Sequence, residues 1–263
     1  MTSSLVYVYA ILSSPLSVEI RGIDAASVRF VTRGDLAAAV SDVPAEAFGE
    51  QALNTNVTDM AWLGPRAVAH QDVNAQLFER SEAIVPLAFG TVFHDDARVQ
   101  EFLSAQSTAL RQHLERVRDA SEWVVALHLL RPLNPEDVAA DSPMIMGLRQ
   151  QIANSPPGRA HLLRQRLQTI ERDESRRLQS EAAQNVLNAL RAISLDVFRE
   201  PLPTDAVEKP LLRASVLVRR ESEADFMDEV DQLRKRWREP TYRLLVTGPW
   251  PPYRFAGLTD DAE

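Results

Sequence analysis

The stretch LVYVYAI, Leu5 to Ile11, decides the fold because it is apolar on both of the alternating faces that a strand presents. Such a strand needs neighbours on each side or cover on both faces, which is the situation in the middle of a sheet. Residues 28–32 and 36–40 are two more strand-like runs, separated by a Gly-containing break of hairpin length at residues 33–35. The sequence therefore predicts a central first strand and an antiparallel hairpin.

Helical and strand-like patterns follow the hairpin. Apolar residues recur at helical spacing from about residue 56 to residue 80, where Pro65 should kink or restart the helix. Residues 83–89 are strand-like but contain Pro86, and a proline confines a strand to an edge, a bulge or an irregular path. This part of the chain therefore predicts one long helix followed by an irregular strand.

A second helix and another strand complete the first domain. Asp95 and Asp96 suit the positive N-terminal end of a helix dipole, and apolar residues continue at helical spacing to Val117. Residues 123–130 are strand-like again. The order of elements predicts an α+β domain over residues 1–131, with helices against one face of an antiparallel sheet, and a ferredoxin-like arrangement fits it best.

A linker and a helix-rich α/β domain are expected in the second half. The segment from Arg131 to Pro143 is rich in proline and acids, with little to bury, which indicates a linker. The second domain is expected over residues 142–263, with a helix near 144–154 and a long one from about 159 to 198. The long helix has a polar middle, which predicts that it projects and is held only at its ends. Its apolar stripe fits either packing on the same chain or a coiled-coil seam for a partner.

Two strands and a helix end this second domain. Residues 211–218 and 241–247 are strand-like, and an amphipathic helix from Phe226 to Trp237 lies between them. Two strands rarely stand alone, so we expect another strand to join them or the first domain to cover them.

Composition excludes several classes of protein and site. The 263 residues carry a formal net charge of −8 and no basic stripe, which argues against a nucleic-acid partner. The absence of cysteine excludes disulfides, cysteine-bound metals and thiol nucleophiles. The apolar run near the N-terminus indicates a strand rather than a signal peptide, and no stretch reaches the roughly 18 apolar residues of a membrane span. We therefore expect a cytoplasmic protein.

No catalytic, cofactor-binding or metal-binding residue emerges from the motifs. The five histidines form no metal-ligand spacing, and His94 with Asp95 and Asp96 is either a weak metal cluster or, more simply, the start of a helix. The glycines form no phosphate-binding loop, and no serine nucleophile has its elbow motif. The motifs therefore give no support to an enzyme.

Two local segments have unusual chemistry. In IVPLAFGTVF, residues 84–93, Pro86 and Gly90 bracket an apolar strand that must bend and turn. In GPWPPY, residues 248–253, the prolines favour polyproline II and should end the preceding strand, which would place Trp250 and Tyr253 on one side. The two aromatics then either pin the chain end onto its own domain or form a rigid ridge for another protein.

These segments resemble the gas vesicle protein GvpF/GvpL family. The similarity extends through LVYVYAI, AHQDVNAQLFERSEAIVPLAFGTVFHD, SEWVVALHLL, SPPGRAHLLRQR and TGPWPPYRFAG, from about residue 5 to residue 257. The chain departs from the family where Ala88 replaces a common arginine and His161 a common tyrosine. The resemblance marks these residues as a structural signature: Pro86, Phe89, Gly90, Gly248, Pro249, Trp250, Pro251, Pro252 and Tyr253.

The resemblance implies a minor structural or assembly protein of gas vesicles, not an enzyme, located in the cytoplasm and at the vesicle. It implies a ferredoxin-like N-terminal domain, an α/β C-terminal domain, no cofactor, and an interaction with the small hydrophobic main shell protein during nucleation or growth. Other gas vesicle assembly proteins are further expected partners. The alternatives are a small-molecule-binding protein or enzyme on a ferredoxin-like scaffold, and a homo-oligomer assembled through the long helix.

Overall fold

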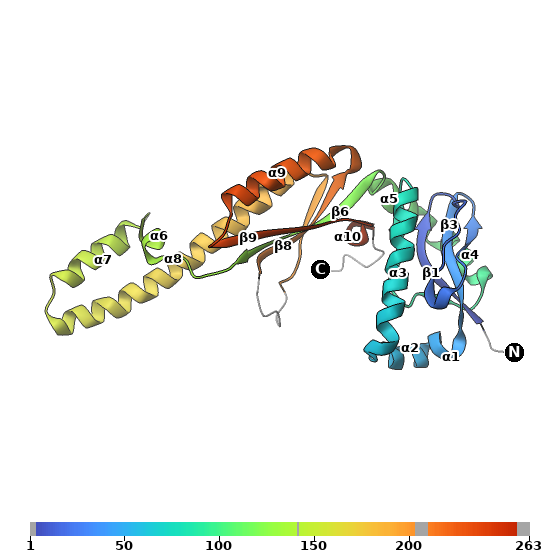
Figure 1. The fold of residues 1–263 in the computed structure, drawn as a ribbon, viewed down its shortest axis with the longest axis horizontal. Coiled ribbons are helices and arrows are strands. Elements are labelled where there is room, and N and C mark those ends of the chain that lie inside the picture. The colour runs from blue at the N-terminus through green and yellow to red at the C-terminus, as the bar shows by residue number, and fades with distance from the viewer. Residues whose placement is uncertain (1–3, 141, 203–209, 257–263) are drawn as a thin grey trace. The chain divides into compact units, whose positions relative to one another are not determined.

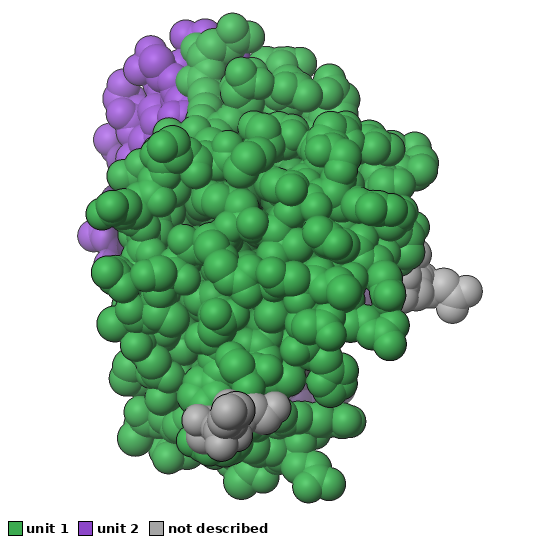
Figure 2. Space-filling model, turned by 90° about the vertical axis from the view of Figure 1, so that its right-hand side faces the viewer, with its two compact units in different colours: residues 1–123, 217–221, 248–263 green, residues 124–216, 222–247 purple. Residues whose placement is uncertain are grey.

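A computed structural model describes residues 4–140, 142–202 and 210–256 and divides the chain into two compact units. Unit 1 comprises residues 1–123, 217–221 and 248–263, and unit 2 comprises residues 124–216 and 222–247 (Figure 1, Figure 2). Unit 1 therefore takes residues from both halves of the sequence. The expected domains, residues 1–131 and 142–263, stay a prediction about which pieces of the chain fold separately.

Unit 1 is built on an antiparallel sheet in the order β2-β3-β1-β4, with β5 also paired to β1. The central position of the first strand and the hairpin after it are confirmed. The fourth strand is short and lies at the edge of the sheet, as its proline predicts. The strands are β1 (Ser4–Leu12), β2 (Arg29–Arg33), β3 (Leu36–Pro44), β4 (Ile84–Pro86) and β5 (Val92–Phe93).

The central strand β1 buries side chains in two separate cores, one on each face of the sheet. Val6 and Val8 join one core, whereas Tyr7 and Tyr9 join the other. The register against β3 shifts between Val8 and Ala10, and a bulge of this kind exchanges the two faces. Ile11 accordingly lies in the core of Val6 and Val8.

Helices cover both faces of this sheet, where the sequence predicted cover on one. Side chains of α3 (Met60–Arg80) pack in the core of Tyr7 and Tyr9, and those of α4 (Asp96–Ala105) and α5 (Ser107–Arg116) pack in the other core. The one-face prediction is wrong because β1 and β3 are apolar on both sides and leave neither face suited to water.

The helix expected near residues 56–80 is interrupted earlier than Pro65 suggested. Short helices α1 (Ala45–Phe48) and α2 (Glu50–Asn56) precede α3, which starts after Asp59 and runs through Pro65. The carboxylate of Asp59 accepts a hydrogen bond from the Ala61 backbone N–H at 2.9 Å and fixes this start.

The α+β class is confirmed, with helices and strands in both units. A ferredoxin-like domain has a helix between its first two strands. Here the connection from β1 to β2 contains the short 3-10 helix η1 (Ile23–Ala25) instead. The ferredoxin-like detail stays a prediction.

A second sheet has the strand order β7-β8-β6-β9. Its strands are β6 (Ala120–Leu129), β7 (Asp196–Arg199), β8 (Pro210–Arg219) and β9 (Tyr242–Trp250). The expected third strand for β8 and β9 is thus β6, which the sequence had placed in the first sheet. Strands β8 and β9 need a neighbour to bury their apolar side chains, and β6 lies between them.

Helices α8 (Pro157–Ala192) and α9 (Glu223–Arg236) lie on one side of the second sheet (Figure 1). Within unit 2, α9 buries Phe226, Val230 and Leu233, and the C-terminal half of α8 buries Val186 and Leu190. The long helix ends at Ala192, before β7, and so is shorter than the predicted span to residue 198.

The N-terminal half of α8 is covered by two short helices. The expected linker contains α6 (Pro135–Ala140), which precedes α7 (Pro143–Ala153). Val138 and Ile145 form a small core with partly buried Leu167, Ile170 and Leu178 of α8. The linker prediction and the prediction of a helix held only at its ends are therefore wrong, because apolar residues in the Pro-rich segment pack on the middle of α8.

No helix among the residues that the structure describes is long and apolar enough to cross a membrane.

Gly248 is predicted to be essential to the stability of unit 1. Its φ is 142°, and an added Cβ would lie 2.9 Å from the Glu122 carbonyl oxygen and 2.9 Å from Trp123 Cε3. We expect Gly248→Ala to lower the free energy of unfolding by about 1–3 kcal/mol in a denaturant titration. Gly64→Ala is the control, because a Cβ there meets nothing within 4 Å and alanine favours the helix by up to about 1 kcal/mol. Equal stabilities of the two variants would contradict the prediction.

Candidate functional site

The two signature segments meet in unit 1 at a polar cluster, which we call the tyrosine node: the buried Tyr7, His70 and Asn74 and the partly exposed Tyr253. The Tyr7 hydroxyl accepts a hydrogen bond from the Gly90 backbone N–H at 3.1 Å and lies 2.9 Å from His70 Nδ1. The Asn74 amide lies 3.0 Å from His70 Nε2 and donates to the Tyr253 hydroxyl at 3.2 Å. The node thus joins the first strand, α3 and both signature segments through side-chain contacts.

Simple periodicities bring these side chains together. His70 and Asn74 are one helical turn apart on α3, on the face that also buries Val73 and Leu77. Tyr7 points to the same side of the sheet as Tyr9, whose hydroxyl lies 2.7 Å from Ser41 Oγ. The spacing of a histidine and an asparagine on an apolar helix face is the sequence signal for this node, and metal-ligand spacings among the histidines do not reveal it.

Burial keeps the node uncharged at neutral pH. It lowers the pKa of His70 to about 4 from the ordinary 6.5, against the raising effect of the Leu87 backbone carbonyl. It also raises the pKa of the Tyr7 hydroxyl, which the hydrogen bond from Gly90 opposes. A neutral His70 has one donor and one acceptor nitrogen, so its two ring nitrogens play opposite roles toward Tyr7 and Asn74. The node therefore orients groups rather than supplying a base.

The first signature segment turns around the node. Pro86 is buried in β4 opposite Ala10, and Phe89 places its ring edge against Tyr7 at 5.9 Å and against His70 at 5.8 Å between centroids. Gly90 has a φ of 89°, and a Cβ there would lie 2.9 Å from a methyl of Leu53. The segment needs glycine at this position because the backbone is left-handed and the neighbouring side chain is close.

The second signature segment is held by different residues from those expected. Strand β9 continues through Pro249 to Trp250, so the prolines do not end it where the sequence predicted. Trp250 is 48% exposed. Pro251 and Pro252 are buried, and α10 (Tyr253–Ala256) places Phe255 in the core next to α5. Strand pairing tolerates Pro249 because β9 is an edge strand.

A buried carboxylate adds to this attachment. Glu122 is 6% exposed, and its Oε2 accepts a hydrogen bond from the Arg254 backbone N–H at 2.7 Å. That N–H belongs to the first turn of α10, where a carboxylate is favoured. Geometry therefore supports attachment of the tail to its own unit, with Tyr253 contributing its hydroxyl to the node.

The His94 cluster is the start of a helix. The Asp95 carboxylate accepts from the Arg98 backbone N–H at 2.9 Å, and Asp96 forms an ion pair with Arg29 at 2.9 Å. No group of three or more histidine, aspartate or glutamate side chains in the described ranges could hold a metal ion.

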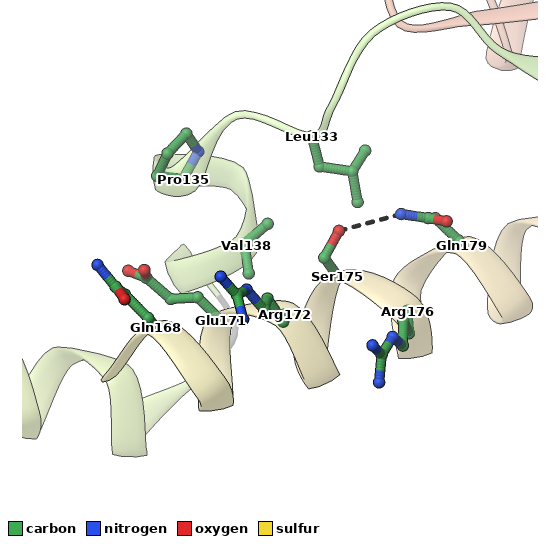
Figure 3. Close-up of a pocket in the computed structure, with 9 residues that line it drawn as sticks. All are labelled: Leu133, Pro135, Val138, Gln168, Glu171, Arg172, Ser175, Arg176 and Gln179. Carbon is green, nitrogen blue, oxygen red and sulfur yellow. Dashed lines mark hydrogen bonds between the residues drawn. The ribbon is translucent and has the colours of Figure 1, made fainter. Parts of the chain in front are cut away.

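Unit 2 has an open groove between the segment that contains α6 and the middle of α8 (Figure 3). Its volume is about 600 Å³. Glu171 in its wall is paired with Arg149 at 2.8 Å, and Ser175 accepts from the Gln179 amide at 3.1 Å. The lining residues are Leu133, Pro135, Val138, Gln168, Glu171, Arg172, Ser175, Arg176 and Gln179. This mixture lacks a nucleophile paired with a base and has no reactive arrangement.

The structure thus combines an α+β architecture with a packed polar node and an open polar groove. The family described as "Gas vesicle synthesis protein GvpL/GvpF" matches residues 5–257. The chain therefore belongs to the GvpL/GvpF family of gas vesicle proteins, a family with a structural and assembly role.

Curated relatives agree with this assignment. The chain is 29% identical to gas vesicle protein L of Streptomyces sp. (strain CB03234) over 99% of its own length and 96% of the relative's. It is 30% identical to gas vesicle protein F of the same strain, with 87% of each chain covered.

Solved structures show the same fold. The crystal structure of GvpF from Anabaena sp. PCC7120 has a TM-score of 0.76 at 17% identity and covers 98% of this chain and 100% of that one. GvpF from Microcystis aeruginosa has a TM-score of 0.69 at 17% identity, covering 96% and 98%. At these identities the likeness is one of fold alone.

Phe255 rather than Trp250 is predicted to hold the tail. Phe255 is 3% exposed, so Phe255→Ala should lower the free energy of unfolding by about 3–5 kcal/mol. Trp250→Ala, at a half-exposed side chain, should lower it by about 1 kcal/mol or less. Thermal melts of the two variants test this. A loss as large for Trp250→Ala would contradict it, and an unchanged melt with lost partner binding would favour the aromatic-ridge alternative.

Stability should depend on pH through His70. Its folded pKa is below the unfolded value, so the unfolded chain binds the extra proton, and stability present above pH 6.5 is lost as pH falls toward 4. The loss should be about 3 kcal/mol. Denaturant titrations at several pH values across this range give the free energy of unfolding as a function of pH. We expect this free energy to change less steeply with pH in His70→Gln than in the native chain. His94→Gln, at an exposed histidine, is the control, and an unchanged slope in His70→Gln would contradict the assignment.

Proposed function

We propose that this protein acts in gas vesicle assembly by binding the main shell protein directly. Membership of a gas vesicle family supports the cellular setting. The observation that carries the proposal is that α8 and α9, the helices of unit 2 that lie along the second sheet in the described part of the chain, are both on one side of it (Figure 1). A sheet face that keeps apolar side chains in water suits a small hydrophobic client.

Strand alternation shows what this face presents within unit 2. Leu244 of β9 is buried, so its neighbour Leu245, which is 46% exposed, points to the opposite face. Phe198 of β7 is 37% exposed. Among the described residues, strands β7 and β9 are also the two edges of the sheet, and an edge strand offers backbone groups to which an added strand can pair. The client would gain both apolar contact and backbone hydrogen bonds.

The structure gives less support to the small-molecule alternative. His70 is enclosed by Tyr7, Asn74 and Phe89, and His94 is exposed beside a helix start. Neither histidine lines the groove of unit 2. An active site that combined a histidine with several arginines would need an arrangement different from this one.

The proposal is tested by co-expressing the tagged protein with the main shell protein and measuring capture. Specific capture is expected, and Leu245→Glu with Phe198→Glu should reduce it roughly tenfold by placing charges at exposed apolar positions of the two edge strands. Met60→Glu is a matched control in unit 1, because Met60 is 72% exposed. Thermal melts confirm that each variant is folded.

Two results would overturn this function. One is failure of the native protein to capture the shell protein when both are folded and soluble. The other is an equal loss of capture in the variant of the second sheet and in the Met60→Glu control, because that would place the contact outside the second sheet.

A further inference from the structure

The helical hairpin formed by α7 and the start of α8 is a cationic part of a chain that is acidic as a whole. From Pro143 to Ile170 the sequence contains four arginines and neither aspartate nor glutamate, whereas the whole chain carries a net charge of −8. Figure 1 shows α7 running back alongside the first half of α8. Charge of one sign is therefore concentrated on one helical hairpin.

Three of the four arginines on this hairpin have no ion-pair or side-chain hydrogen-bond partner within the described part of the chain. Arg149 is used internally by Glu171, but Arg159, Arg164 and Arg166 form no ion pair or side-chain hydrogen bond there. Elsewhere in the protein arginines are commonly paired, as Arg29 is with Asp42 and Asp96. Three unpaired guanidinium groups on adjacent turns give a surface that attracts carboxylates.

One face of α8 alternates cation, apolar group and cation. Arg159, Leu162 and Arg166 are spaced by three and four residues and lie on the same face. Leu162 is 66% exposed. We call this row the α8 ridge. Arg164 is two residues from Leu162 and lies on a different face.

A polar hollow adjoins the ridge. It has a volume of about 370 Å³ and is lined by Gly147, Gln150, Gln151, Asn154, Ser155 and Arg159. Three side-chain amides and a guanidinium are good donors for a carboxylate, and no acid competes with it in the lining. Met144 and Met146 on α7 are 59% and 52% exposed and add adaptable apolar contact on the same hairpin.

We propose that the α8 ridge and its hollow bind an acidic amphipathic segment of another protein. Two carboxylates of that segment pair with Arg159 and Arg166, and one of these carboxylates reaches into the hollow. An apolar side chain of the segment packs on Leu162. The charge of the hairpin selects an acidic partner, and the exposed leucine between the arginines selects an amphipathic one over a purely polar chain. This surface is separate from the sheet face proposed for the shell protein and does not depend on that function.

The experiment uses the full-length protein and a fluorescent amphipathic peptide with leucine on one face and glutamate on the other. A second peptide has glutamine in place of every glutamate. Binding is followed by anisotropy at low and high salt. We expect the glutamate peptide to bind at least roughly tenfold more tightly than the glutamine peptide, with the difference reduced by salt.

Substitutions in α8 distinguish the ridge from general attraction. Arg159→Gln and Arg166→Gln should each weaken binding of the glutamate peptide roughly tenfold, since each removes a charge-assisted pair. Leu162→Gln should weaken it as well. Arg164→Gln is the matched control, with the same loss of charge on the same helix, and should leave affinity within about twofold. All four positions are exposed, and melting temperatures verify that the variants fold.

Each alternative ligand of the α8 ridge would give a different result in these experiments. Equal losses for Arg164→Gln and Arg159→Gln would overturn the ridge in favour of general attraction. Binding to vesicles of phosphatidylglycerol and phosphatidylcholine without binding to the glutamate peptide would identify a membrane surface instead. Displacement of the peptide by inorganic phosphate at low concentration would indicate a simple anion site. A mass in solution that falls from oligomer to monomer in Arg159→Gln would identify a second copy of this chain.

Discussion

The hydroxyl of Tyr7 has to find partners inside unit 1, and this requirement organises much of the unit. Tyr7 is fully buried on the central strand, where an unsatisfied hydroxyl would cost about 1–3 kcal/mol. Its partners come from α3 and from the turn after β4, so the helix and the turn must take fixed positions relative to the strand. The signature segments therefore belong to one structural unit even though they are far apart in the sequence. Their common chemistry is the completion of a buried hydrogen-bond network.

Unit 2 follows a different principle, because α8 serves two sets of contacts along one continuous helix. Its C-terminal half supplies buried apolar side chains beside the second sheet, and its N-terminal half carries α6 and α7. A single helix of 36 residues can do both because its polar middle pairs internally, as Arg177 does with Glu174 and Glu181. The sheet face and the cationic hairpin are thus separate surfaces on one support.

Local pattern predicted the elements well where a single constraint acted. The apolar run at Leu5, the hairpin around Gly34 and the helix start at Asp95 were readable because strand alternation, left-handed glycine and carboxylate capping each have a sequence signature. The partner of a strand has no such signature. Strand β6 follows the first sheet in the sequence but pairs with β8 and β9, because those strands need a neighbour that only tertiary contacts can select.

The site was less readable than the fold for the same reason. The signature residues were found, but the sequence could not show that Tyr253 reaches Asn74 or that Phe255 fills the core of Val6 and Val8. No sequence pattern indicates the bulge in β1, although the bulge changes which residues share a core. These features arise from contacts between segments that the chain separates by many residues, and a single sequence carries no record of them.

Construction of unit 1 from both ends of the chain has a consequence for the order in which the protein is made. A ribosome releases the first strand, α4 and α5 long before it releases Phe255 and Ala256, which are buried in the same core. Until then the nascent unit lacks part of its core and the last hydroxyl of its hydrogen-bond network. The contact between residues 253–256 and the N-terminal part of unit 1 joins segments that are far apart in the sequence, and such contacts form slowly. The newly made protein therefore completes its first unit only after its second has been synthesised.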